Sequence, residues 1–458
     1  MKIKPLLLTA ACFGSLLSAQ AQNQDSLMLR KIFDESLVNG QSYQNLRYLC
    51  KNIGGRLSGS VNAQKAVEWG KKLMDSYGFD KVYLQEVMVP HWERGEKEQG
   101  YIISGGKKIP VHLAALGMSI ATPKEGITAE VIEVHSLDEV NKLGDKVKGK
   151  IVFYNRPFDP RFVQTLQAYG AANDQRGAGP ALAAKYGAVG ALVRSMTEAD
   201  DDFPHTGGTR LAKDGPNVPA AALSTKAANL LSATLKSSKA PVKFFLKQNC
   251  RQLPDALSYN VVGEIKGSRN PNKYITVGGH LDSWDLAEGA HDDGTGVTQS
   301  VEALRILKTL GYKPQNSLRV VFFMNEENGD RGGLKYAELA AQNKEEHIAA
   351  IESDLGGFTP RGFSFEGIDA NQLKQIRQSW GALLEPYNAN KLTEGEGGTD
   401  IGPLREKFPK VMLIGFMPDP QRYFDVHHTP NDVFENVNKR ELELGAAAIA
   451  SLVYLLDK

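Results

Sequence analysis

Apolar residues recur at helical spacing close to the start of the chain, at Leu29, Ile32, Phe33 and Leu37. The run stops at Asn39-Gly40, a common helix terminator, so a helix is predicted from residue 25 to this point. A second amphipathic run predicts a helix over 61–77. Apolar and polar residues alternate over 81–89, and this pattern predicts a half-buried strand.

The C-terminal half alternates short apolar runs with longer helical patterns. The runs predict strands over 274–277, 318–324, 349–353 and 409–416; the helical patterns cover 297–310, 334–341 and 440–456. Strands that alternate with helices favour parallel pairing, because each connection crosses over one face of the sheet. The fold class predicted is α/β: a mixed, largely parallel sheet flanked by helices.

The middle of the chain has a different texture. Between 115 and 250, short β-rich runs are separated by Gly, Pro and Asp turns, and the only histidines are His135 and His205. We interpret this segment as an inserted β-rich domain without a catalytic role. The predicted organisation is 22–114 and 251–458 as one domain, with 115–250 inserted into it.

The first 21 residues have the pattern of a secretory signal peptide. Lys2 and Lys4 precede an apolar run over 5–17, and Ala19-Gln20-Ala21 follows as a cleavage site. The run is too short for a membrane anchor, and a lipid-modified Cys12 is the other alternative. We expect an exported, periplasmic or secreted protein. No later segment is long enough to span a membrane.

Composition narrows the function further. The chain has 458 residues with 54 Lys+Arg against 53 Asp+Glu, a balance unlike the basic excess of nucleic-acid-binding proteins. Three cysteines are too few for a disulfide scaffold. Whether Cys50 and Cys250 pair stays open, and a metal ion would have to be bound by His and carboxylate side chains.

Acidic residues and histidines gather where predicted strands end. His280 and Asp282 follow the strand over 274–277, Glu326-Glu327 follow 318–324, and Asp354 follows 349–353. Asp292 and His427-His428 stand in two further acidic and His-rich segments. Because ligands bind at the carboxyl ends of strands in open α/β sheets, we expect these side chains to share one edge.

Such a cluster of carboxylates would repel itself unless cations neutralise it. Each member alone has an ordinary structural explanation, such as a turn, a helix cap or a solvated pair. Together they supply His nitrogen and carboxylate oxygen, which Zn²⁺ accepts. Five ligands suffice for two ions that share one carboxylate: His280, Asp292, Glu327, Asp354 and His428. Glu326 is then free to act as a base.

These motifs resemble those of the co-catalytic di-zinc exopeptidases, the family of bacterial leucyl aminopeptidases and glutamate carboxypeptidases. The resemblance extends over nearly all of the chain after residue 21, and 115–250 resembles the protease-associated domain inserted in several members. It implies that Asp292 bridges two zinc ions. It assigns His280 and Asp354 to one ion, and Glu327 and His428 to the other.

The resemblance also implies roles around the metal ligands. Asp282 would orient His280 and Glu326 would be the general base. His427 stands where relatives often have a tyrosine that donates to the oxyanion. A substrate-contacting loop is implied for three residues, Gly398, Thr399 and Asp400.

Two alternatives on the same fold remain open: a glutaminyl-cyclase type of enzyme with one zinc ion, and a receptor-like protein without catalysis. No G-x-S-x-G elbow and no H-E-x-x-H motif occurs, which argues against a serine hydrolase and a thermolysin-like enzyme. The resemblance implies a short peptide substrate and a homodimer. It leaves open whether the enzyme is an aminopeptidase, a carboxypeptidase or a dipeptidase.

Overall fold

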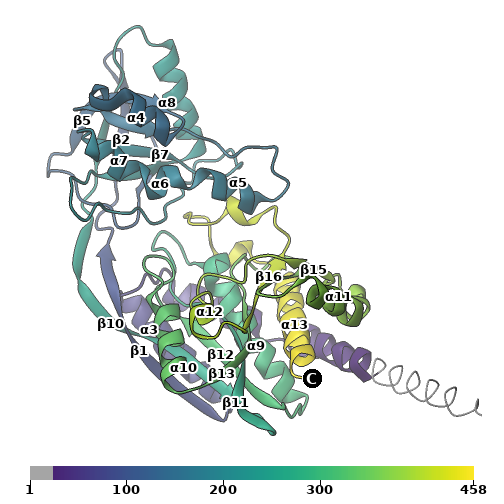
Figure 1. Cartoon of the computed structure of the whole chain (residues 1–458). Helices are drawn as coiled ribbons and strands as arrows, with labels where there is room; N and C mark the ends of the chain where they lie inside the picture. The colour runs from purple at the N-terminus through teal and green to yellow at the C-terminus, as the bar shows by residue number, and fades with distance from the viewer. Residues whose placement is uncertain (1–23) are drawn as a thin grey trace, which may run out of the picture.

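The computed structural model describes residues 24–458, which form two α/β units (Figure 1). The predicted signal peptide and Cys12 lie outside the described residues. Two long antiparallel strands, β1 (Lys81–Glu93) and β10 (Arg251–Ile265), belong to the sheet of the first unit and lead into and out of the second. The second unit is therefore an insertion between these two strands.

The first unit is built on an eight-stranded mixed sheet in the order β1-β10-β12-β11-β13-β16-β14-β15. Its four central strands are parallel neighbours: β12 (Asn316–Phe323), β11 (Asn270–His280), β13 (Glu346–Glu352) and β16 (Met412–Pro418). The edge beyond them consists of β14 (Pro360–Glu366) and β15 (Lys391–Glu394). The predicted α/β class with a largely parallel centre is confirmed.

Helices cover both faces of this sheet. One face packs against the helix over 24–39 and against α2 (Ser42–Tyr48), α3 (Val61–Ser76), α9 (Thr295–Thr309), α11 (Ala370–Leu384) and α13 (Lys439–Leu456). The other face packs against α10 (Arg331–Gln342) and α12 (Leu404–Lys407).

Strand β12 shows why its sequence is apolar throughout. Val320 and Phe322 point into the first hydrophobic core, and Val321 and Phe323 point into the second. Alternate side chains of a strand face opposite sides, so a strand between two helical layers needs apolar residues at every position.

The second unit has its own eight-stranded sheet, in the order β3-β2-β9-β5-β6-β7-β8-β4. Its strands are β2 (Gln99–Ser104), β3 (Lys107–Pro110), β4 (Leu113–Ala115), β5 (Ile127–Val134), β6 (Ile151–Tyr154), β7 (Gly190–Arg194), β8 (Ala220–Leu223) and β9 (Lys243–Lys247). Helices flank it: α4 (Leu137–Leu143), α5 (Thr165–Ala172), α6 (Asp174–Gly177), α7 (Gly179–Lys185) and α8 (Thr225–Ser237). The sheet thus begins at Gln99, ahead of the residue 115 expected from the sequence. The protease-associated likeness stays a prediction.

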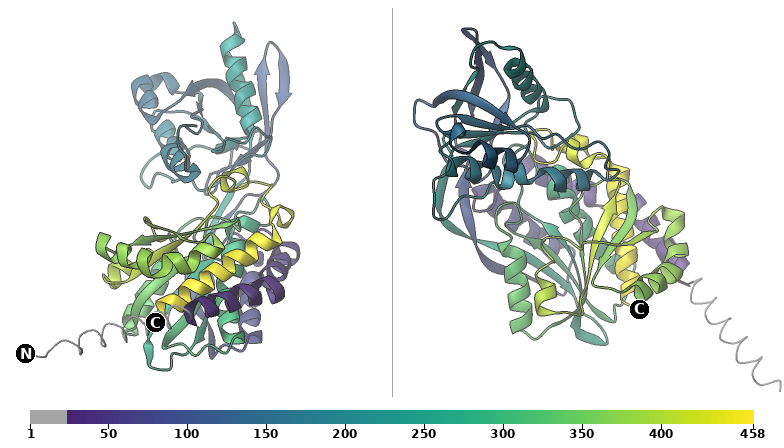
Figure 2. Two further views of the ribbon diagram at one scale, coloured as in Figure 1. Left: turned by 90° about the vertical axis from the view of Figure 1, so that its right-hand side faces the viewer. Right: turned by 45° about the horizontal axis from the view of Figure 1, so that its top comes forward.

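The two units meet around the segment that follows β16, drawn in yellow (Figure 2). The Gln421 side chain donates to the carbonyl of Val163 at 3.0 Å, and Phe158 of the second unit packs edge-on against Phe424. The segment after β16 also carries the predicted ligand His428, so the contact between the units lies next to the predicted metal site.

Two further expectations can be compared with the structure. Cys50 and Cys250 are both buried and unpaired, and they lie in different hydrophobic clusters. Within 24–458, no helix is both long enough and apolar enough to cross a bilayer.

Candidate metal centre

The predicted ligands come from the carboxyl ends of adjacent parallel strands. His280 is the last residue of β11, Glu327 follows β12, and Asp354 follows β13. Asp292 lies in a turn, η3 (Ala290–Gly294), that leads into α9, and His428 lies in the loop after β16. Because these strands are parallel neighbours, their ends bring the side chains to one edge of the sheet.

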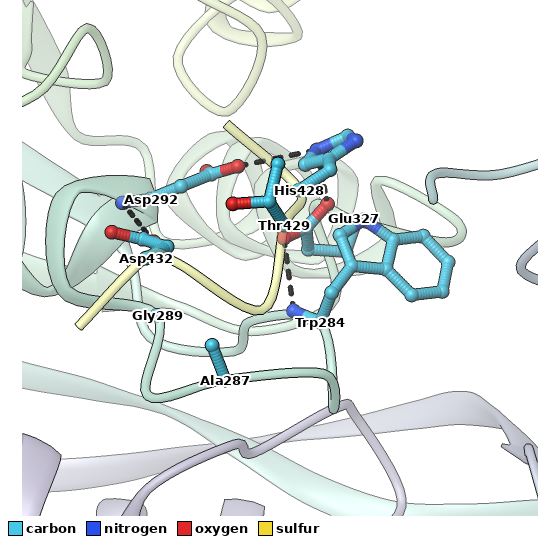
Figure 3. A pocket seen from close by; sticks show the side chains of 8 residues that line it. All are labelled: Trp284, Ala287, Gly289, Asp292, Glu327, His428, Thr429 and Asp432. Carbon is cyan, nitrogen blue, oxygen red and sulfur yellow. Dashed lines mark hydrogen bonds and ion pairs between the residues drawn. The ribbon is translucent and has the colours of Figure 1, made fainter. Parts of the chain in front are cut away.

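The donor atoms of the other four residues converge around Asp292, and Figure 3 shows Asp292 with two of them, Glu327 and His428. Asp292 Oδ1 lies 3.2 Å from His280 Nε2, and Asp292 Oδ2 lies 3.2 Å from His428 Nε2. His280 Nε2 is 3.4 Å from Asp354 Oδ1, and His428 Nε2 is 3.1 Å from Glu327 Oε2. The two carboxylate oxygens of Asp292 therefore face two separate groups of donors.

Several of these atoms have no hydrogen-bond partner among the described residues although they are buried. They are His280 Nε2, Asp292 Oδ2 and Asp354 Oδ1. Buried polar atoms without partners are costly, and nitrogen and carboxylate oxygen are the donors that Zn²⁺ accepts. His280, Asp292 and Asp354 hold ligand atoms within 4.8 Å of one another, as do Asp292, His427 and His428. The donor set fits two divalent cations that share Asp292.

Glu326, the predicted base, is half-buried next to this cluster. Burial raises the pKa of its carboxyl well above the usual range; His280 opposes this shift, and Asp354 adds to it. Cations bound to the cluster would favour the carboxylate form instead. The protonation state of Glu326 therefore depends on the charge of the site.

The Asp282 carboxylate is placed differently from the sequence-based expectation. His280 Nδ1 lies 3.0 Å from the backbone carbonyl of Asp282 and 3.9 Å from its Oδ1. Oδ1 accepts instead from the backbone N–H groups of Asn325 (2.7 Å) and Glu326 (3.2 Å). Asp282 therefore orients His280 through its main chain and fixes the segment of the predicted base through its side chain.

His427 faces the predicted bridging carboxylate. Its Nε2 is 3.7 Å from Asp292 Oδ2, and its ring stacks on that of His428 with centroids 3.5 Å apart. His427 therefore packs against two predicted ligands, and its role as the oxyanion donor stays a prediction.

Glu352 holds the loop that contains Gly398, Thr399 and Asp400. The Glu352 carboxylate accepts from the backbone N–H groups of Thr399 (2.9 Å) and Ile401 (3.0 Å). Thr399 is exposed, but the Asp400 side chain is buried and both its oxygens lack partners among the described residues. The Asp400 side chain thus points into the protein, and a substrate contact of the loop stays a prediction.

Two positioning residues escaped the sequence reasoning. The Asp432 carboxylate accepts from the backbone N–H groups of His291 (2.7 Å) and Asp292 (3.1 Å), so it holds the predicted bridging residue in place. Burial raises the pKa of Asp432 to about 7. Arg56 is fully buried and donates to three backbone carbonyls of the 281–289 segment. Neither has a local sequence signal, because each acts on a segment far away in the chain.

The second unit takes part in the site, which the sequence did not predict. Arg176 Nη1 lies 3.4 Å from His428 Nδ1, and the Thr206 N–H donates to the His428 carbonyl at 2.9 Å. Helix α6 and one loop of this unit therefore contact a predicted ligand, and the absence of a catalytic role for 115–250 stays a prediction.

A small cavity lies beside the predicted ligands. It is lined by predicted ligands and by the segments around them: Trp284, Ala287, Gly289, Asp292, Glu327, His428, Thr429 and Asp432 (Figure 3). The backbone N–H of Trp284 donates to Glu327 Oε1 at 3.1 Å, so the wall of the cavity also positions a predicted ligand. Fold and site together define a metal-dependent hydrolase with two adjacent cation positions.

Comparison with known proteins gives the family. The profile described as Peptidase family M28 matches residues 260–453. Bovine carboxypeptidase Q is 36% identical over 420 residues, which cover 92% of this chain and 86% of the relative; the Xenopus laevis protein is 38% identical over the same coverage. The chain belongs to peptidase family M28.

Solved structures agree with this assignment. The M28 peptidase precursor from Shewanella amazonensis superposes with a TM-score of 0.90 at 30% identity, covering 95% of this chain and 97% of the other. A zinc aminopeptidase from Bacillus subtilis shares the fold with a TM-score of 0.63 at 19% identity, covering 91% of this chain and 94% of the other. The chain is accordingly a hydrolase that cleaves peptides, a metallo-exopeptidase.

Proposed function

We propose that this protein is a zinc-dependent exopeptidase that hydrolyses dipeptides or short peptides with a free terminus. The observation that carries the proposal is the convergence of five His and carboxylate side chains in two groups around Asp292. His280 Nε2 and His428 Nε2 each lie 3.2 Å from one carboxylate oxygen of Asp292. Asp354 lies 3.4 Å from the first histidine, and Glu327 lies 3.1 Å from the second. Asp292 would hold both ions. His280 and Asp354 would complete one position, and Glu327 and His428 the other.

When bound, a pair of zinc ions lowers the pKa of a water molecule and polarises the scissile carbonyl. Glu326 takes the proton from that water as its oxygen attacks the carbonyl carbon, and then passes the proton to the leaving amine. The carboxylate of Asp282 keeps the Glu326 main chain in place during both transfers. The chain thus supplies a base whose main chain is held in place by a hydrogen bond.

Some matching relatives are named carboxypeptidase and others aminopeptidase. The end of the peptide substrate that this chain recognises therefore has to be measured. The most direct measurement is a hydrolysis screen of free, N-blocked and C-blocked dipeptides, with and without a chelator. Loss of cleavage on N-blocking identifies an aminopeptidase, loss on C-blocking a carboxypeptidase, and loss on both a dipeptidase.

Glu326→Gln tests the mechanism. We expect the variant to keep two zinc equivalents and to lose on the order of 10²–10⁴ in kcat, the usual size of a general acid–base contribution. Glu338→Gln is the matched control, because that carboxylate is exposed and pairs only with surface residues of its own helix. Near-normal turnover of Glu326→Gln would refute the base assignment, and one zinc equivalent in the wild type would refute the paired site.

We also propose export through the signal peptide predicted at residues 1–21, and assembly as a homodimer. The first proposal rests on the basic, apolar and small-residue pattern of this segment. N-terminal sequencing of the protein from the periplasm or culture medium tests it, and a cytoplasmic, uncleaved product would contradict it. Sedimentation of the purified protein tests the dimer.

A further inference from the structure

Tyr169, on α5 of the inserted unit, reaches the metal centre of the other unit. Its ring packs edge-on against His427, with centroids 5.2 Å apart, and stacks on Phe424 at 4.7 Å. We propose that Tyr169 is the hydrogen-bond donor to the oxyanion formed during peptide hydrolysis, and that Arg176 is its positioning residue. This inference rests on the proposed peptidase function.

The contact with Arg176 fixes the direction of the phenol. Arg176 Nη2 donates to the Tyr169 oxygen at 2.6 Å. A guanidinium has donors only, so the phenol oxygen must accept and its own hydrogen must point elsewhere. Among residues 24–458 no group accepts that hydrogen. The phenol therefore has a free O–H whose orientation is already restricted.

The same guanidinium locates this O–H beside the predicted ligands. Arg176 Nη1 lies 3.4 Å from His428 Nδ1 and donates to the Thr206 carbonyl at 3.3 Å. One flat group thus spans the phenol and the imidazole of a predicted ligand. The loop that carries Thr206 is itself held by its N–H bond to the His428 carbonyl.

Tyr169 is better placed for this role than His427. The His427 ring stacks on that of His428 and makes a tilted contact with Tyr423. Its Nε2 atom lies 3.7 Å from the Asp292 carboxylate. An N–H at this position has that carboxylate beside it, whereas the phenol O–H of Tyr169 has no acceptor among residues 24–458. An ordinary phenol has a pKa near 10, so it keeps its proton at neutral pH. A preorganised donor of this type contributes most where charge develops during the reaction.

Tyr169→Phe in the zinc-loaded, full-length protein tests the proposal. We expect kcat to fall about 10²-fold, the usual effect of removing one oxyanion donor, with KM changed by less than about threefold because the substrate carbonyl needs this bond less. Affinity for a phosphinic dipeptide analogue, measured by calorimetry, should fall by a similar factor, while affinity for the product amino acid stays unchanged.

Tyr154→Phe is the matched control. Tyr154 is a buried tyrosine of the same unit whose O–H donates to the Gly179 carbonyl at 2.6 Å, away from the metal centre. Its removal should lower the thermal midpoint without changing kcat. Arg176→Gln should lower kcat in the same direction as Tyr169→Phe, and the double variant should be no slower than Tyr169→Phe alone, because Arg176 acts through the phenol.

Three results would overturn the proposal: an active wild type with Tyr169→Phe turnover within threefold of it, an unchanged affinity for the phosphinic analogue, or a double variant with fully additive losses. If the wild type cleaves no peptide, the proposed function fails by itself, and the analogue affinity still decides the role of Tyr169. If Tyr169→Phe binds fewer than two zinc ions, its activity no longer reports on the phenol alone. Arg176→Lys leaves the phenol in place, and its kcat and its affinity for the phosphinic analogue then decide the proposal.

Discussion

Replacing Arg56 by methionine removes a cation that the fold has buried completely. Its guanidinium is 0% exposed and donates to the carbonyls of Leu281 (2.5 Å), Glu288 (2.7 Å) and Gly289 (3.0 Å). No carboxylate within 24–458 forms an ion pair with it. Burial lowers the pKa of Arg56, so the hydrogen bonds are what offset its desolvation.

The expected magnitude follows from these three bonds. A hydrogen bond to a charged group contributes roughly 1.5–3 kcal/mol, and an acceptor left unpaired costs about 1–3 kcal/mol. Water that enters the space left by the shorter side chain recovers part of this. We expect Arg56→Met to lower the free energy of unfolding by about 4 kcal/mol. Lysine reaches fewer of the carbonyls, so Arg56→Lys should lose about 2 kcal/mol.

Urea unfolding followed by circular dichroism measures these differences, with chelator present so that zinc binding adds nothing. Arg30→Met is the control, because Arg30 pairs with Asp34 on an exposed helical surface, and such pairs contribute below about 1 kcal/mol. Since the carbonyls lie between His280 and Asp292, Arg56→Met should also weaken zinc binding. A loss below about 1 kcal/mol in Arg56→Met would refute the reasoning.

Two further variants test other parts of the structure. Asp432→Asn should weaken zinc affinity about 10–100-fold, because its carboxylate holds the main chain of Asp292; competition with a chelating dye measures this, and an unchanged affinity would contradict it. Burial alone would raise the pKa of Glu345, but His347 and Arg319 outweigh it and lower the pKa to about 2. Because the pKa of Glu345 is lower in the folded state than in the unfolded state, its carboxylate stabilises the folded protein above about pH 4.5. This stabilisation is lost as the pH falls toward 2. Glu345→Gln should therefore cost about 2 kcal/mol at pH 7, after allowance for solvent screening, and progressively less on acidification; equal losses at pH 7 and pH 3 would show that the ion pair is not responsible.

The elements with a complete local pattern were predictable. The predicted strand over 318–324 corresponds to β12, and the predicted helix over 297–310 corresponds to α9. Both are recognisable because consecutive residues carry the pattern of burial: the strand is apolar throughout, and the helix is apolar along one face. Strand β10 escaped prediction. Its first half is largely polar and exposed and pairs only with β1, so its conformation depends on a partner distant in sequence. The short strands β14 and β15 escaped prediction for the same reason.

The sequence by itself determined the set of candidate donors, since all five predicted ligands are His or carboxylate residues and most of them follow apolar strands. Tertiary structure alone decided what surrounds them. The Asp282 carboxylate turned toward the main chain of Glu326, and Asp400 turned inward. Arg176 of the inserted unit was brought to His428. The positions of strand ends follow from local patterns, and parallel strands bring their carboxyl ends to one edge. The direction of a side chain depends instead on neighbours from remote segments.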